Sequence, residues 1–104
     1  MTTSAPAPPG VARCHTIHRP AFGVRVEGTI DRYNAAAIAA EIVEHLRERH
    51  RPTLVDLSDV VFADCAGVRL VRGALQTLDG VGVPLEIRTS DPVARVSFDL
   101  RRFA

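Results

Sequence analysis

The stretch that decides the fold runs Thr53-Leu54-Val55-Asp56-Leu57-Ser58-Asp59-Val60-Val61-Phe62-Ala63-Asp64-Cys65-Ala66-Gly67-Val68-Arg69-Leu70-Val71. Its first five residues form a nearly continuous β-favouring run, which is typical of a central strand covered on both faces. From Asp64 the apolar residues take helical spacing and keep it until Gly80 and Gly82 end the pattern. A buried strand therefore leads into an amphipathic helix, as in a parallel α/β sheet.

The flanking segments repeat this alternation of strand and helix. In chain order, the patterns predict strands at 12–18 and 22–27 that form a hairpin, a helix at 34–49, a strand at 83–88 and a short helix from residue 93. Asp31 or Asn34 is expected to cap the helix at 34–49, which ends near Arg51-Pro52. Asp91 followed by Pro92 opens the last helix.

The order of these elements predicts an α/β fold. We expect a four- to five-stranded, mostly parallel β-sheet with an N-terminal antiparallel hairpin, packed by about three to four α-helices. The 104 residues are enough for one core and too few for two. Residues 12–104 are therefore expected to form a single domain, and residues 1–11, rich in Pro and Ala, a flexible tail.

Composition narrows the classes of function. The formal net charge is +1, all 13 basic residues are Arg, and most of them alternate with acids along the chain. No stripe of positive charge for nucleic acid is predicted, because phosphate binding needs a local excess of basic residues. No apolar stretch approaches the roughly 18 residues that span a bilayer, so we expect a cytoplasmic protein without membrane insertion.

The residues that could carry catalysis or bind a metal do not form a convincing site. Cys14 and Cys65 lack the spacing of a zinc site or a disulfide framework, and nothing places a histidine beside Cys65. His15 and His18 lie three apart in a predicted strand and project to opposite faces. Asp56, Asp59 and Asp64 fall in turns where Asp is common. We therefore expect no enzyme activity, no catalytic or metal-binding residue and no cofactor.

Three segments, taken together, resemble the STAS domain family. The run Asp56-Leu57-Ser58 followed by a short apolar stretch and Asp64-Cys65-Ala66-Gly67-Val68 is similar to the family's Asp-Leu-Ser and Asp-Ser-Ser-Gly-Leu signature. The segment 27–31 resembles the family's entry into its first helix, and the segment 90–96 resembles the opening of its last helix. The resemblance covers roughly residues 12–100 in the right order, which is more specific than any single motif.

The resemblance implies a bacterial anti-sigma factor antagonist that acts by partner switching. Such a protein binds an anti-sigma factor, often a serine kinase, and so releases the sigma factor. Phosphorylation of the second hydroxyl residue in Asp-Ser-Ser-Gly ends that binding in the family. Here Cys65 and Ala66 replace the two serines, so the phosphoacceptor-equivalent position, Ala66, has no hydroxyl. The protein is then either a constitutive antagonist or controlled through Ser58, the Cys65 thiol or its own abundance.

The resemblance also indicates where a partner would bind. The predicted surface consists of the helix start and of polar positions on or near the following helix: Ser58, Asp64, Cys65, Ala66, Gly67, Arg69, Arg72 and Gln76. Arg69 and Arg72 lie three apart and share a helix side, where they could meet acids on a partner. Asp64 also has a structural role as a helix cap, and Gly67 allows close approach of the helix to neighbouring backbone.

Two other functions remain open. Small STAS proteins also serve as soluble accessory subunits of lipid-transporting ABC systems, where the helix start often has alanine at the position of Ala66 and the partner is the ABC ATPase. A thiol-dependent enzyme would require a reactive Cys65, whose thiolate the helix N-terminus would favour. The sequence does not determine the oligomeric state.

Overall fold

A computed structural model describes residues 15–99 of the chain. In chain order the elements are β1 (His15–His18), β2 (Gly23–Ile30), α1 (Ala35–Leu46), β3 (Thr53–Phe62), α2 (Cys65–Gly80), β4 (Leu85–Thr89) and α3 (Pro92–Ser97). The four strands lie in the sheet in the order β1-β2-β3-β4, with β1 antiparallel to β2 and the other pairs parallel. The predicted α/β class, mostly parallel sheet and N-terminal hairpin are confirmed. The predicted tail, residues 1–11, lies outside the described residues.

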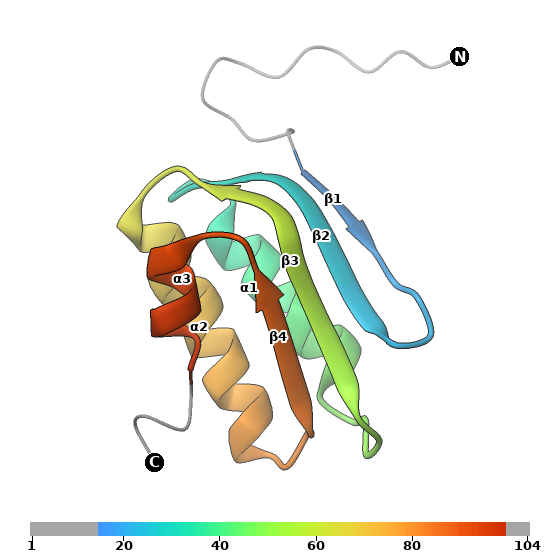
Figure 1. Cartoon of the computed structure of the whole chain (residues 1–104). Coiled ribbons are helices and arrows are strands. Elements are labelled where there is room, and N and C mark those ends of the chain that lie inside the picture. The colour runs from blue at the N-terminus through green and yellow to red at the C-terminus, as the bar shows by residue number, and fades with distance from the viewer. Residues whose placement is uncertain (1–14, 100–104) are drawn as a thin grey trace, which may run out of the picture.

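Helices α1 and α2 cover the same face of the sheet, as Figure 1 shows. This follows from topology, because two right-handed crossovers that step in the same direction along a sheet leave both helices on one side. The core between the layers is apolar. Its largest fully buried side chains are Ile30, Ile38, Ile42, Leu46, Leu57, Leu75, Leu78, Val24, Val26, Val55 and Val71.

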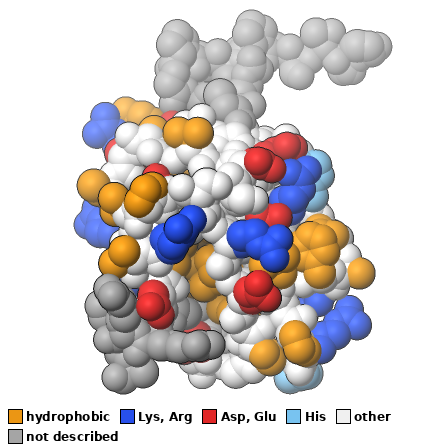
Figure 2. Space-filling model, viewed as in Figure 1, with side chains coloured by type: hydrophobic (Ala, Val, Ile, Leu, Met, Phe, Trp, Pro, Cys, Tyr) orange, Lys and Arg blue, Asp and Glu red, His pale blue; other side chains and the backbone are white. Residues whose placement is uncertain are grey.

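The other face of the sheet carries polar and charged side chains, so the prediction that β3 is covered on both faces is wrong. Arg25 lies here between Asp59, at 3.1 Å, and Glu27, at 3.6 Å, and His18 contacts Glu27 at 3.0 Å. Figure 2, viewed as Figure 1, shows acidic and basic side chains close to one another. Because these charged side chains can face solvent, this side of the sheet needs no covering layer of helices, whereas an apolar face would need one.

Strand β3 continues through Phe62, five residues beyond the predicted end at Leu57. The register against β2 shifts here, because Arg25 pairs with Asp56 and Glu27 with Asp59, so two residues of β3 oppose one of β2. This bulge resets the alternation and turns Val60 and Phe62 toward the core. The sequence interval Ser58-Asp59 breaks the apolar pattern, which explains why the strand was predicted too short.

Helix α1 ends at Leu46, three residues before the predicted end at Arg49. The side chain of Arg49 bonds the carbonyl of Ala21 at 2.8 Å and the hydroxyl of Thr53 at 2.9 Å. These bonds hold the segment after α1 in the turn that leads into β3. Strand β4 begins at Leu85 rather than residue 83, since Val83 donates to Leu78 in the turn that closes α2.

Each of the three turns that lead from a strand into a helix is built on an aspartate. Asp31 accepts the N–H groups of Tyr33 and Asn34 before α1, Asp64 accepts from Gly67 at the start of α2, and Asp91 accepts from Val93 and Ala94 at the start of α3. Asn34 is the N-cap of α1, but its side chain bonds Asp31 and Thr29 and makes no cap bond. Because parallel strands end at one edge of the sheet, the three turns lie at the same end of the molecule.

Candidate functional site

Asp64 forms the centre of the turn between β3 and α2. Its backbone is extended, and its Oδ1 accepts the N–H of Gly67 at 3.0 Å, which confirms the predicted helix cap. Its second oxygen, Oδ2, accepts the N–H of Arg32 at 3.0 Å, although Arg32 lies 32 positions earlier in the chain. One carboxylate thus joins the start of α2 to the loop between β2 and α1.

The surrounding backbone holds this turn in place. The N–H of Ala63 donates to the carbonyl of Ile30 at 2.9 Å, so the β3–α2 turn is attached to the end of β2 a second time. The Asn34 side chain donates to the carbonyl of Thr29 at 2.8 Å and fixes the β2–α1 loop from its other side. We refer to residues 63–67 as the Asp64 turn. Its position is set by bonds within the domain.

Hydrogen bonding also sets the charge state of Asp64. The N–H of Gly67, followed by the N–H and positive charge of Arg32, outweighs the effect of burial and lowers the pKa of the Asp64 carboxyl below its ordinary value. The group is therefore ionised at neutral pH. A carboxylate that is stabilised in this way by N–H donors is a weak proton acceptor, because the pKa of a general base needs to be near the working pH.

Gly67 is required by the close approach of α2 to β2. A Cβ at this position would lie 3.1 Å from Cγ2 of Ile30 and 3.2 Å from its carbonyl oxygen. Both contacts are tighter than ordinary van der Waals packing, so even a methyl group would push α2 away from the sheet. The structure accounts for Gly67 by packing alone.

Four of the predicted partner-binding residues lie on one side of α2. Cys65, Arg69, Arg72 and Gln76 recur at intervals of four, three and four residues, which places them along a single helix side. Cys65, Arg69 and Gln76 are exposed and Arg72 is half-buried. We call these four residues the polar side of α2. Ala66, half-buried, lies on the opposite flank with Leu70.

Ser58 lies apart from these residues, within β3. Its N–H and its hydroxyl both donate to Oδ1 of Asp56, and its carbonyl accepts from the hydroxyl of Ser90 at 2.9 Å. The side chain is half-buried on the sheet face that the helices leave open. The structure thus brings together the predicted residues 64–67 and the polar side of α2 but not Ser58.

The structure adds three exposed residues that the sequence analysis did not select. Arg32 and Tyr33 follow Asp31 in the loop that Asp64 holds, and the guanidinium of Arg32 lies 5.1 Å from the centre of the Tyr33 ring. Leu70 is an apolar residue on the flank of α2 that carries Ala66. A signal was present in the sequence, since an aromatic residue inside a polar turn and a leucine outside the core stripe of a helix have little to bury.

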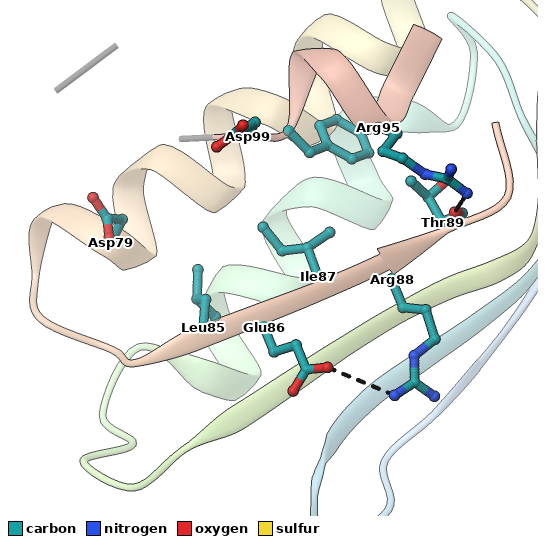
Figure 3. A pocket seen from close by; sticks show the side chains of 9 residues that line it. Asp79, Leu85, Glu86, Ile87, Arg88, Thr89, Arg95 and Asp99 are labelled. Carbon is teal, nitrogen blue, oxygen red and sulfur yellow. Dashed lines mark hydrogen bonds and ion pairs between the residues drawn. The ribbon is translucent and has the colours of Figure 1, made fainter. Parts of the chain in front are cut away.

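A shallow groove lies elsewhere, between β4 and α3 (Figure 3). Leu85, Ile87 and Phe98 form its apolar part. Its arginines already have partners, because Arg88 lies 3.6 Å from Glu86 and Arg95 donates to the carbonyl of Thr89 at 3.1 Å. Arg95 thus connects α3 to the end of β4, whereas the Arg88–Glu86 pair lies within β4.

Possible metal ligands, the two cysteines and possible membrane-spanning helices were also considered in the sequence analysis. Within residues 15–99, no three His, Cys, Asp or Glu side chains gather as metal ligands would. Cys65 is a free, exposed thiol, and Cys14 lies outside the described residues. Over the same residues, no helix has both the length and the apolar character needed to cross a bilayer.

Comparison with known families agrees with this geometry. A family model described as "Mlab, STAS domain" matches residues 16–103, which is most of the chain. The chain belongs to the STAS domain family. No curated protein matches it closely enough to be counted as a relative. Membership gives this STAS domain a general regulatory role that works through contact with other proteins.

Proposed function

We propose that this STAS domain is an anti-sigma factor antagonist that binds its partner through the Asp64 turn and the polar side of α2. The observation that carries the proposal is the double attachment of Asp64, to Gly67 and to Arg32. It fixes the shape of the turn before binding, with Cys65 on the turn and the exposed Arg69 just beyond it in α2. A preformed surface loses little conformational entropy on association. The favoured partner is an anti-sigma factor of the serine-kinase type.

The proposal includes a missing off-switch. A phosphate on the helix start would add about −1.5 to −2 charges beside the Asp64 carboxylate and would disfavour binding. Ala66 offers no hydroxyl to accept it, and Cys65 next to it carries a thiol. The domain therefore acts as a constitutive antagonist, or it is regulated by another route such as its abundance.

We also propose that the domain works without catalysis, in the cytoplasm where both candidate partners act. Asp64 is the carboxylate at the centre of the turn, and its lowered pKa and two N–H donors suit it to hold structure. Ser58, the nearest hydroxyl named as a candidate, donates to Asp56 within the sheet, away from the turn. The lowered pKa of the Asp56 carboxyl makes it a weak base for the Ser58 hydroxyl, so neither arrangement favours an activated nucleophile.

A second candidate partner is the ATPase of a lipid-transport ABC system. Ala66 favours it, because the helix start Asp64-Cys65-Ala66-Gly67 is more similar to the pattern of transporter-associated STAS proteins than to that of sigma regulators. The same exposed surface would serve in either case. The two candidates differ in the partner and in what its release controls.

Affinity capture from the source cell tests the proposal. The wild-type chain is expected to retain an anti-sigma factor, and the double substitution Arg69→Glu and Arg72→Glu is expected to lose it while the circular dichroism spectrum stays unchanged. Arg47→Glu with Arg51→Glu is the matched control, because it reverses two charges at the far end of α1. Capture of an ABC ATPase selects the second candidate. Equal affinity of the wild type and the Arg69/Arg72 variant for the captured protein rejects this surface.

A further inference from the structure

The Asp64 turn has a second flank, opposite the polar side of α2. Tyr33 is 66% exposed and Leu70 is 41% exposed, both unusually open for large apolar side chains. Arg32 is exposed as well, and its Nη2 donates to the Tyr33 hydroxyl at 3.2 Å. We call Arg32, Tyr33 and Leu70 the Tyr33 patch.

The fold places the members of this patch next to the Asp64 turn. Arg32 is held there by its N–H bond to Asp64. Helix α2 packs between α1 and α3 (Figure 1). One flank of α2 carries Asp79, which lines the groove beside β4 and α3. Leu70 lies on the opposite flank by helical spacing, and this flank faces α1. Tyr33 lies two residues before the first residue of α1. Arg32 and Tyr33 therefore lie at the start of α2, and Leu70 is exposed in the second turn of the same helix.

We propose that the Tyr33 patch is a second contact of this domain with its partner, beside the polar side of α2, and that the partner offers an apolar pocket bordered by acidic residues. This inference rests on the proposed function and names the chemistry of the partner surface. Tyr and Arg are the residue types that most often dominate binding energy, and a Tyr ring loses little entropy on burial. A cation–π pair such as Arg32 and Tyr33 also becomes stronger once it leaves water.

The charged groups around the Asp64 turn indicate the charge of the partner surface. The carboxylates of Asp31 and Asp64 are directed at backbone N–H groups of the domain itself. The guanidinium of Arg32 lies over the exposed ring instead, and Arg69 is exposed on the first turns of α2. The N-termini of α1 and α2 at this end add positive potential. An acidic partner surface complements this arrangement, and a basic surface would be repelled.

Binding measurements with single substitutions test the proposal against the purified anti-sigma factor and the purified ABC ATPase. Tyr33→Ala and Leu70→Ala are each expected to weaken binding about tenfold or more, the loss typical of a hot-spot residue. Tyr33→Phe keeps the ring and is expected to bind within about twofold of the wild type. Arg32→Glu keeps the backbone bond to Asp64 and is expected to slow association, with a weaker dependence of the rate on salt.

The other end of the molecule provides matched controls. Phe22 is 43% exposed before β2, Val81 is 60% exposed after α2, and Arg51 is exposed before β3. Phe22→Ala, Val81→Ala and Arg51→Glu are expected to leave binding within about twofold of the wild type. Circular dichroism and melting temperature establish that each variant is folded.

The outcomes separate this inference from the proposed function. If the wild type binds one partner and the Tyr33, Leu70 and Arg32 variants bind equally well, the Tyr33 patch is rejected and the proposed function stands. If the wild type binds neither partner, both are rejected. Tighter binding by Arg32→Glu overturns the acidic chemistry of the partner. Loss of a homodimer in Tyr33→Ala, with partner affinity unchanged, assigns the patch to a second copy of the chain and also overturns the proposal.

Discussion

The carboxylate of Asp64 accepts the N–H of Arg32 at 3.0 Å, so the residue that caps α2 also holds the loop that leads into α1. The two helices therefore share one anchor at the end of the sheet. Substitution of Asp64 consequently disturbs two elements at once, which an ordinary helix cap would not do.

We predict a graded loss of stability at this position. Asp64→Asn retains one acceptor oxygen and Asp64→Ala retains none, so the melting temperature is expected to fall by a few degrees in the first variant and further in the second. Hydrogen exchange of the Arg32 amide is expected to accelerate with that of Gly67. Asp91→Ala, which removes the cap of α3 alone, is the control. Unchanged exchange at Arg32 in Asp64→Ala would contradict the shared anchor.

Two of the three glycines of α2, Gly67 and Gly73, are expected to change stability in opposite directions when each is replaced by alanine. Gly67→Ala places a Cβ 3.1–3.2 Å from Ile30 and is expected to cost about 1–3 kcal/mol of unfolding free energy through overpacking. Gly73→Ala meets nothing within 4 Å and is expected to stabilise by about 0.5–1 kcal/mol, because alanine favours the helix. Urea unfolding measures both values. Equal effects would mean that the contact with Ile30 does not limit Gly67.

Stability is expected to fall in acid because of Asp56. Burial raises the pKa of its carboxyl, but the hydroxyl and N–H of Ser58, together with Arg88 and Arg25, outweigh it and bring the net pKa below the ordinary 3.8. A carboxyl whose pKa is lowered by folding stabilises the native state above its ordinary pKa, and this stability is lost as pH falls through the folded-state pKa. Urea midpoints between pH 6 and about pH 3 measure the loss.

Glu27 is expected to add to this acid sensitivity. Its hydrogen bond with His18, and then the charge of Arg25, lower the pKa of the Glu27 carboxyl below 4.5, so its ionised form also stabilises the native state, as for Asp56.

Two variants test the contribution of Asp56. Asp56→Asn should flatten the acid limb of the stability curve, and Ser58→Ala should flatten it partly, since the N–H of Ser58 remains. An acid limb that is identical in Asp56→Asn and the wild type would assign the effect to other groups.

Much of the fold could be predicted because its signals are local. The alternation of apolar and polar residues in β4 and the helical spacing of apolar residues after Asp64 are each contained in one short stretch of sequence. Asp91 with Pro92 marks the start of α3 in the same way. The extension of β3 was missed because it depends on the bulge between the Arg25 and Glu27 pairs, which only pairing with β2 creates. A sequence pattern cannot show which residue two strands leave unpaired.

The candidate site could be predicted only in part for the same reason. The cap at Asp64 depends on residues close in the chain, and it was expected. Close approach at Gly67 was also expected, although its neighbour, Ile30, lies in another strand and could not be predicted. The contact between Asp64 and Arg32 joins positions 32 apart, and it is this contact that brings Tyr33 to the start of α2. Ser58 was grouped with the site by sequence proximity, whereas β3 carries it to the open face of the sheet.

The alanine at position 66 is expected to decide whether phosphorylation can control the domain. When the captured partner is a serine kinase, the wild type incubated with it and ATP should gain no phosphate on residues 63–68. Ala66→Ser restores a hydroxyl at the second residue of α2 and should become phosphorylated. The added charge of about −1.5 to −2 beside Asp64 should then weaken partner binding at least about tenfold. Intact-mass spectrometry and titration calorimetry measure the two effects.

Ala40→Ser is the matched control, because it adds a hydroxyl on an exposed residue of α1, outside the Asp64 turn. We expect it to bind the partner as the wild type does, with or without ATP. Phosphate on the helix start of the wild type would contradict the missing switch outright. Phosphorylated Ala66→Ser that still binds at full strength would show that the partner does not approach the start of α2, since a doubly charged group cannot be placed inside a contact with an acidic surface at no cost.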